Sequence, residues 1–299
     1  MRLATLRTPY GTTCIRVEGD GIGVDLEHED VGALLREPDW RKAAEMSGEP
    51  VAFVAEDLAP VVPQPGKIIC VGVNYAKHAR EMGRELPSQP TLFIKFPDAL
   101  TGPYDDVHIP PFGQSKLDYE GELAVVIGRR AHHVAATDAL DYVAGYAIMN
   151  DYTLRDLQRA TTQFHAGKSF YRTAGFGPWL DTDFAPGRHA RLTTRLDGEV
   201  RQDDDTDDLI FSIPTLIEFC SSLYPLNPGD VIATGTPEGV GFARGEFIDD
   251  GQVVRIDIEG LGHIENKTIF DADALPSVVG QDLLRHSCAC GGHCSCGGH

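Results

Sequence analysis

The sequence predicts a β-rich α+β fold with a small N-terminal α/β domain, and three observations support this fold class. Short apolar stretches separated by turn residues recur along most of the chain, a pattern typical of β-strands. Ser212–Leu223 is the clearest segment with apolar residues at helical spacing. Strands do not alternate regularly with helices, which argues against a parallel α/β sheet. A β-rich roll or barrel is therefore expected.

Residues 1–62 are expected to form the separate N-terminal domain. Two strand-like segments, a turn and the start of a helix follow one another there: Leu3–Leu6, Thr12–Val17, Gly19–Gly21 and Val31–Leu35. Prolines at positions 60, 63 and 65 then stiffen the chain, which is typical of a domain boundary. The larger domain would span residues 63–280, and a Cys/His-rich tail would span residues 281–299.

Strands in the larger domain are expected at Lys67–Val73, Thr91–Lys95, Leu123–Ile127, Tyr142–Met149, Ala190–Leu196, Glu199–Arg201, Val231–Thr234 and Val253–Ile258. Asp197-Gly198 between two of them indicates a hairpin. Asn74–Gly83 indicates a helix or an ordered loop, and Leu154–Thr162 is expected to be helical. Ser212 can cap the helix that follows it.

Composition limits the partners and the compartment. The net charge of −19 predicts no nucleic-acid partner, because neutralising phosphates requires Lys and Arg. No run approaches the roughly 18 apolar residues of a membrane span, so no membrane partner is expected. The N-terminus lacks the apolar core of a signal peptide, which predicts a cytoplasmic protein. Asp203–Asp208 is predicted to be an exposed acidic loop, and Cys14, Cys70 and Cys220 are expected to be reduced core residues.

Three carboxylates form the most informative cluster. Glu120 and Glu122 flank Gly121 at the start of an apolar strand candidate, so both side chains would project to one face. Asp151 ends a second such stretch. Carboxylates forced together repel unless a proton or a cation neutralises them, and a hard cation such as Mg²⁺ takes oxygen ligands. The alternative is a set of ordinary exposed carboxylates.

Three further clusters contain polar residues suited to catalysis or to ligand binding. His78 and Glu81 share a helix face, an arrangement that suits activation of water by a general base; the alternative is a surface ion pair. Lys168 lies in a segment rich in glycine and aromatic residues, where a lysine can face an anion. Thr236 lies among small residues at 227–241 that allow a ligand to approach the backbone; the alternative there is a plain turn.

The order of these motifs resembles the fumarylacetoacetate hydrolase family. The motifs are Val-Asn-Tyr-x-x-His-x-x-Glu, Asp-Tyr-Glu-x-Glu-Leu, Asn-Asp-x-x-x-Arg-Asp-x-Gln, Gly-Lys-Ser and Pro-Gly-Asp-x-Ile-x-Thr-Gly-Thr-Pro-x-Gly-Val-Gly, over residues 66–270. Within the family, the chain resembles bacterial members of the acylpyruvate hydrolase or 2-hydroxyhepta-2,4-diene-1,7-dioate isomerase type. The resemblance implies a mixed β-sandwich roll, a homodimer and a bound Mg²⁺, with Mn²⁺ or Ca²⁺ as alternatives.

Carried onto this chain, the resemblance implies a role for each motif residue. The expected metal ligands are Glu120, Glu122 and Asp151, and the expected catalytic residues are His78, Glu81 and Lys168. The expected contacts to a small anionic 2-oxo or diketo acid substrate are Thr236, Arg155, Gln158 and Tyr75. After Gly-Lys-Ser, this chain departs from the family pattern, because Tyr171 and Gly175 replace an acidic residue and a proline.

The leading expectation is hydrolysis of a C–C bond in a β-diketo or acylpyruvate-type acid. His78 and Glu81 would activate water, while Mg²⁺ and Lys168 would stabilise the enolate. The first alternative is a 2-oxo acid decarboxylase acting on oxaloacetate, or an isomerase of the same family, since one fold hosts several reactions. A further alternative is a non-catalytic metal-binding protein. Two Cys-x-Cys-Gly-Gly-His repeats in residues 288–299 suggest a Zn²⁺ site in the tail.

Overall fold

The computed structural model describes residues 1–185 and 189–272. The Cys/His-rich tail, with its expected Zn²⁺ site, lies outside the described residues. Among the described residues, no helix is long and apolar enough to cross a membrane.

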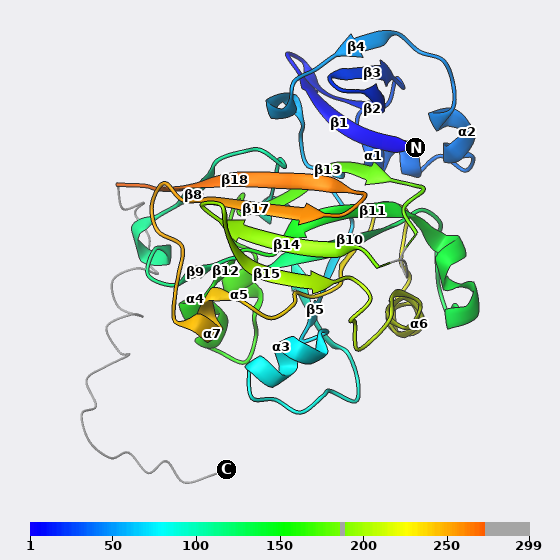
Figure 1. Ribbon diagram of the computed structural model, residues 1–299. Coiled ribbons are helices and arrows are strands. Elements are labelled where there is room, and N and C mark those ends of the chain that lie inside the picture. The colour runs from blue at the N-terminus through cyan, green and yellow to red at the C-terminus, as the bar shows by residue number, and fades with distance from the viewer. Residues whose placement is uncertain (186–188, 273–299) are drawn as a thin grey trace, which may run out of the picture.

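Two large sheets form the body of the protein (Figure 1). The larger one has, in spatial order, β4 (Pro50–Ala52), β3 (Ile22–Asp25), β2 (Gly11–Gly19), β1 (Arg2–Thr8), β13 (Ala174–Asp181), β11 (Val143–Asn150), β10 (Gly121–Ile127), β16 (Val231–Ala233), β5 (Ile68–Gly72) and β6 (Thr91–Lys95), with β7 (Leu100–Thr101) beside β13. The second has β15 (Glu199–Asp205), β14 (Arg191–Leu196), β17 (Val253–Ile258), β18 (Gly262–Phe270) and β8 (Val107–Ile109). A short pair joins β9 (Leu117–Asp118) to β12 (Thr153–Leu154).

Short helices occupy the connections between the strands. They are α1 (Val31–Leu35), α2 (Trp40–Ala44), α3 (Ala76–Glu81), α4 (Arg155–Arg159), α5 (His165–Lys168), α6 (Ile213–Leu223) and α7 (Gly241–Arg244). Four 3₁₀ turns complete the set: η1 (Ala55–Asp57), η2 (Pro97–Ala99), η3 (Pro111–Gly113) and η4 (Ala136–Tyr142).

The alternation of residues along β10 places it between two cores. Leu123, Val125 and Ile127 pack in the core that also contains the inner residues of β14 and β17. Ala124 and Val126 point to the opposite face, into a core shared with α1 and α2. A strand buried on both faces is apolar throughout, which explains the continuous apolar run in the sequence. Parallel pairs occur among antiparallel ones, so the predicted β-rich mixed sandwich is confirmed.

The N-terminal strands extend the edge of the large sheet. Arg2 and Leu3 of β1 pair with Asp181 and Leu180 of β13. In Figure 1 these strands, drawn in blue, lie at one end of the molecule, and α3 projects from the other end below β5. The folding of residues 1–62 as an independent domain stays a prediction.

The helix predicted at Ser212–Leu223 is confirmed as α6, and the Ser212 hydroxyl accepts a hydrogen bond from the backbone N–H of Thr215 at 3.4 Å. The expectation of an exposed acidic loop at 203–208 is wrong for its first half. Asp203–Asp205 belong to β15, and Asp204 is buried because alternate residues of that strand face inward. The strand β18 was not predicted, because its many polar residues obscure the alternation of apolar and polar positions that is typical of a strand.

We predict that Gly121→Ala destabilises the protein, because the two sheets approach closely at this position. An added Cβ would overlap the buried Thr194 Oγ1 and lie 3.1 Å from the Ile256 side chain of the facing sheet. Overpacking of this kind costs about 1–3 kcal/mol in the free energy of unfolding. Gly19→Ala is the control, since a Cβ in that strand would meet nothing within 4 Å. Urea unfolding measures both variants, and equal midpoints would contradict the prediction.

Candidate active site

The β10–β11 register brings the three predicted carboxylates together. Gly121 pairs with Asn150, so Glu120, just before β10, and Glu122, within it, meet Asp151, just after β11. The Asn150 side chain accepts a hydrogen bond from the Glu120 N–H at 3.0 Å, and the Asp151 N–H donates to the Glu120 carbonyl at 2.8 Å. One carboxylate oxygen from each acid lies within 4.8 Å of the others, and all three residues are buried. The backbone therefore fixes the cluster without help from a ligand.

Two lysines contact the carboxylate cluster. Lys168 Nζ donates to Glu120 Oε2 at 2.6 Å and to Asp151 Oδ2 at 2.7 Å. Lys95 Nζ, from β6, lies 2.8 Å from Asp151 Oδ1 and also donates to the Lys168 carbonyl. Burial opposes the charged form of Lys168, but the Asp151 and Glu120 carboxylates outweigh it and raise the pKa of this lysine. The two carboxylates therefore favour the charged form of Lys168.

Arg155 is held between two acids. Its Nη1 lies 2.8 Å from Glu120 Oε1, and its Nη2 lies 2.6 Å from Asp118 Oδ2. Asp118 also accepts hydrogen bonds from the N–H groups of Gly241 and Phe242, at 2.8 and 2.9 Å, and thereby anchors the start of α7. Burial raises the pKa of Asp118 despite the neighbouring guanidinium.

The charges around the cluster leave one carboxylate without a cation. Asp118, Glu120, Glu122 and Asp151 face three cationic side chains, those of Lys95, Lys168 and Arg155. Within residues 1–185 and 189–272, Glu122 forms no ion pair; its Oε2 accepts from the Gly235 N–H at 3.0 Å. Burial, then Asp151 and Glu120, raise the pKa of Glu122 well above its ordinary value. A buried carboxyl that needs either a proton or a cation, together with an all-oxygen donor set, fits a hard divalent cation.

The predicted His–Glu pair lies on α3. His78 Nδ1 is 3.0 Å from Glu81 Oε2, and Glu81 Oε1 accepts from the Gly239 N–H at 2.9 Å. An ionised Glu81 only accepts hydrogen bonds, so Nδ1 carries the proton and Nε2 is the free basic nitrogen. Lys77, on the same helix, lies 2.6 Å from the buried Asp204 of β15. Thus α3 is tied to the body of the protein on both sides of His78.

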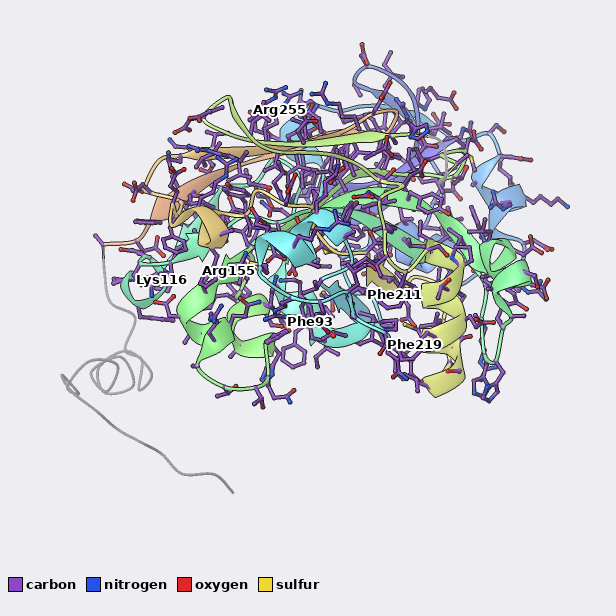
Figure 2. The ribbon with its side chains drawn as sticks, turned by 60° about the horizontal axis from the view of Figure 1, so that its bottom comes forward. Phe93, Lys116, Arg155, Phe211, Phe219 and Arg255 are labelled. Carbon is purple, nitrogen blue, oxygen red and sulfur yellow. The ribbon has the colours of Figure 1, made fainter. Side chains whose placement is uncertain are left out.

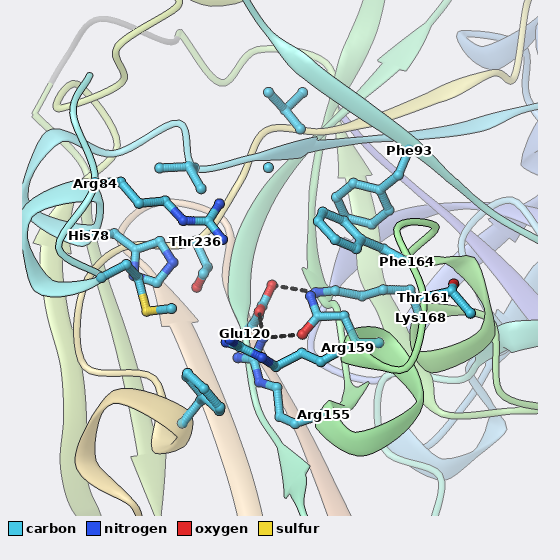
Figure 3. Close-up of a pocket in the computed structure, with 16 residues that line it drawn as sticks. His78, Arg84, Phe93, Glu120, Arg155, Arg159, Thr161, Phe164, Lys168 and Thr236 are labelled. Carbon is cyan, nitrogen blue, oxygen red and sulfur yellow. Dashed lines mark hydrogen bonds and ion pairs between the residues drawn. The ribbon is translucent and has the colours of Figure 1, made fainter. Parts of the chain in front are cut away.

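A cavity of about 260 Å³ opens in front of Glu120 (Figure 3). Its lining residues are Val71, Gly72, Val73, His78, Met82, Arg84, Phe93, Glu120, Arg155, Gln158, Arg159, Thr161, Phe164, Lys168, Thr236 and Phe242. Figure 2 shows Phe93 and Arg155 near α3, on the side of the molecule opposite Arg255. Most of the predicted site residues therefore line one cavity.

Tyr75 and Thr236 lie differently from their predicted roles. Tyr75, the residue before α3, is fully buried and does not line the cavity. The Thr236 hydroxyl donates to the Gly121 carbonyl at 3.0 Å and accepts from Gln202 Nε2 at 2.8 Å. Its backbone N–H donates to no other described residue. Thr236 would therefore offer a substrate carboxylate its amide rather than its hydroxyl.

Three residues that contact the site were assigned no role from the sequence: Lys95, Asp118 and Gln202. Lys95 gives a weak signal, since a lysine amid Phe93, Ile94 and Phe96 is expected to be buried with a partner. Gln202 gives none, because its partners lie 34 and 81 residues away in the chain. A second acidic group, His189, Asp205 and Asp207, lies at the surface, where such groups commonly hold no ion.

Residues 67–269 match the family model described as the C-terminal domain of fumarylacetoacetate (FAA) hydrolase. The chain belongs to the fumarylacetoacetate hydrolase family. The matched range contains every residue of the cluster and the cavity described above, and the resemblance inferred from the motifs is confirmed.

The chain is similar to relatives of known sequence and of known structure. The chain is 45% identical over 213 residues to oxaloacetate tautomerase YisK of Bacillus subtilis, which covers 69% of this chain and 71% of that protein. It is 42% identical over 218 residues to the mitochondrial oxaloacetate tautomerase FAHD2A of Bos taurus, with 71% and 69% covered. The structure of 5-carboxymethyl-2-hydroxymuconate delta-isomerase from Mycobacterium smegmatis superposes with a TM-score of 0.77 at 33% identity, covering 91% of this chain and all of that one.

We predict that Mg²⁺ stabilises the protein through Glu122. At a concentration one hundred times its Kd, a ligand that binds only the folded state adds about 2.7 kcal/mol to the free energy of unfolding. Glu122→Gln should abolish the corresponding rise in Tm, because it removes a charged ligand. Glu265→Gln, at a half-exposed carboxylate, is the matched control and should keep the rise. An undiminished Mg²⁺ effect in Glu122→Gln would contradict the assignment.

We predict that Lys77→Met loosens α3. The change leaves the Asp204 carboxylate buried without its cation, at a cost of about 1 kcal/mol, the upper end for a half-exposed ion pair. Amide hydrogens of residues 78–82 should then exchange roughly fivefold faster. Lys77→Arg should restore protection, and Arg191→Met, which removes the exposed pair with Asp203, should leave α3 unchanged. Equal exchange in Lys77→Met and wild type would refute the role of this pair.

Proposed function

We propose that the protein is an isomerase that interconverts the keto and enol forms of a small 2-oxo acid, with oxaloacetate as the first candidate. One observation carries the proposal. His78 and Lys168 reach toward the same cavity from opposite sides of Glu120 (Figure 3). The relatives named as oxaloacetate tautomerases and the neighbour named as a delta-isomerase support this reaction class.

The reaction needs a base, a stabilised enolate and no water. His78 Nε2 would take a proton from C3, the C2–C3 single bond would become a double bond, and the 2-oxo oxygen would gain negative charge. Lys168 Nζ has three N–H bonds, of which two go to Glu120 and Asp151, so one remains to stabilise that oxygen. The enolate oxygen then takes a proton from water while the His78 imidazolium releases its proton to water, which completes the enol; the reverse sequence restores the ketone. The Thr236 N–H would hold the carboxylate next to the 2-oxo group.

Glu120, Glu122 and Asp151 would hold a divalent cation, for which we propose Mg²⁺, with Mn²⁺ or Ca²⁺ as alternatives. When bound, such a cation supplies Lewis-acid stabilisation of a developing enolate oxygen. The homodimer implied by the family resemblance remains part of the proposal, and so does the cytoplasmic location expected from the N-terminal sequence.

Hydrolysis of a C–C bond in an acylpyruvate-type acid is the second candidate function. The hydrogen bond between His78 and Glu81 favours it, because a carboxylate that stabilises imidazolium suits activation of water. Decarboxylation of oxaloacetate would use the same enolate-stabilising groups without that water. The isomerase proposal ranks first because two relatives above 40% identity carry the tautomerase name.

We predict that the Mg²⁺-loaded protein accelerates the decay of enol-oxaloacetate, followed by its ultraviolet absorbance. His78→Gln should lower kcat by about 10²–10⁴, the contribution of a general base. His108→Gln is a matched control, because His108 lies 3.0 Å from Asp271 in a similar but exposed pair, and it should keep full activity.

The reaction products distinguish the isomerase from the hydrolase and the decarboxylase. Acetate and pyruvate released from acetylpyruvate, with no effect on enol-oxaloacetate, would replace the isomerase by the hydrolase. Pyruvate and CO₂ formed from oxaloacetate at the rate of enol decay would indicate the decarboxylase.

A further inference from the structure

Two arginines that line the cavity have no carboxylate partner. Of its four cationic side chains, Arg155 and Lys168 are bound to Asp118, Glu120 and Asp151. Arg84 and Arg159, in contrast, form no ion pair with any residue in 1–185 or 189–272. In a chain with a net charge of −19, carboxylates are abundant, so a guanidinium left free beside a cavity is available for an anionic ligand.

Both arginines are positioned by the elements that build the site. Arg159 is the last residue of α4, and its guanidinium stacks 4.5 Å from the centroid of the Phe242 ring, which also lines the cavity. Stacking uses the flat face of the guanidinium and leaves its N–H edges for hydrogen bonds. Arg84 follows α3, and its backbone N–H donates to the Ala79 carbonyl at 2.9 Å. Arg84 is therefore carried by the same segment as His78.

The two side chains approach the cavity from different elements. Figure 3 shows Arg84 on the side of His78 and Thr236, and Arg159 reaching in from the opposite side, next to Glu120 and Arg155. The carboxylate cluster and Lys168 lie between them, where the 2-oxo group would react. A carboxylate at the far end of a short substrate would thus meet guanidinium groups rather than acids.

A substrate with two carboxylates needs cationic groups near both of its ends. The acidic surface repels a dianion more strongly than a monoanion, so local cations must compensate for each carboxylate. In the proposed reaction, the Thr236 N–H and Lys168 serve the 2-oxo acid end. The second carboxylate of a diacid would have no partner among these groups.

We propose that Arg84 and Arg159 bind the carboxylate remote from the 2-oxo group, and that they make the site selective for 2-oxo dicarboxylates over 2-oxo monocarboxylates. This inference rests on the proposed function for the identity of the 2-oxo acid. It assigns specificity, not proton transfer, to the two arginines.

Binding of unreactive analogues tests the inference separately from catalysis. Malate and 2-hydroxybutyrate differ in that a methyl group replaces the remote carboxylate, and neither has a 2-oxo group to tautomerise. Titration calorimetry of the full chain with Mg²⁺ should show that malate binds about 10- to 100-fold more tightly, the range for hydrogen bonds to charged groups. Arg84→Gln and Arg159→Gln should each weaken malate binding and leave 2-hydroxybutyrate binding unchanged.

Arg129→Gln is the matched control, because Arg129 also stacks on an aromatic ring, that of Tyr142 at 5.1 Å, but does not line the cavity. It should keep the preference for malate. Equal binding of the two acids, no binding of either, or a preference that survives in both cavity variants would overturn the inference. A preference that is lost in the variants, in a protein without activity on enol-oxaloacetate, would support the inference and refute only the tautomerase reaction.

Discussion

Neutralisation of the buried carboxylates is the constraint on which the rest of the structure depends. Glu120, Glu122 and Asp151 meet because two antiparallel strands place them there, and each is buried. Their mutual repulsion in a medium of low dielectric constant would expel them unless cations approached. Lys95 from β6, Lys168 from α5 and Arg155 from α4 supply that charge, so the buried acids, of which Glu120 lines the cavity, hold the surrounding elements in place.

The same network connects the floor of the cavity to its rim. Arg155 reaches Asp118, which holds the first turn of α7, and Phe242 in that turn forms a wall of the cavity. On the other side, Gln202 of the second sheet donates to Thr236 and accepts from the Gly121 N–H. A change of charge at Glu120 is therefore expected to shift the positions of both Phe242 and Thr236. This network holds the side chains for which we propose catalytic and binding roles in fixed positions around a small cavity.

Sequence reasoning succeeded where local periodicity determines structure. The two-residue spacing of Glu120 and Glu122, and the helical spacing of His78 and Glu81, place each pair on one face without knowledge of the fold. It failed where the partner is distant in the chain. Asp204 was assigned to an exposed loop because its partner Lys77 lies 127 residues away, and the burial of Lys95 depends on Asp151, 56 positions further along. The choice between hydrolysis and isomerisation was not determined by the motifs, because both reactions pass through a stabilised enolate.

The central claim is that the buried acids, left with one carboxylate in excess, hold a divalent cation. The most direct test is a crystal structure grown with Mn²⁺, with anomalous scattering used to locate the metal. If these acids hold the cation, one strong anomalous peak should lie within coordination distance of Glu120, Glu122 and Asp151, and Lys168 should remain beside Glu120. A cluster without a peak, or a peak at His189, Asp205 and Asp207 instead, would contradict it.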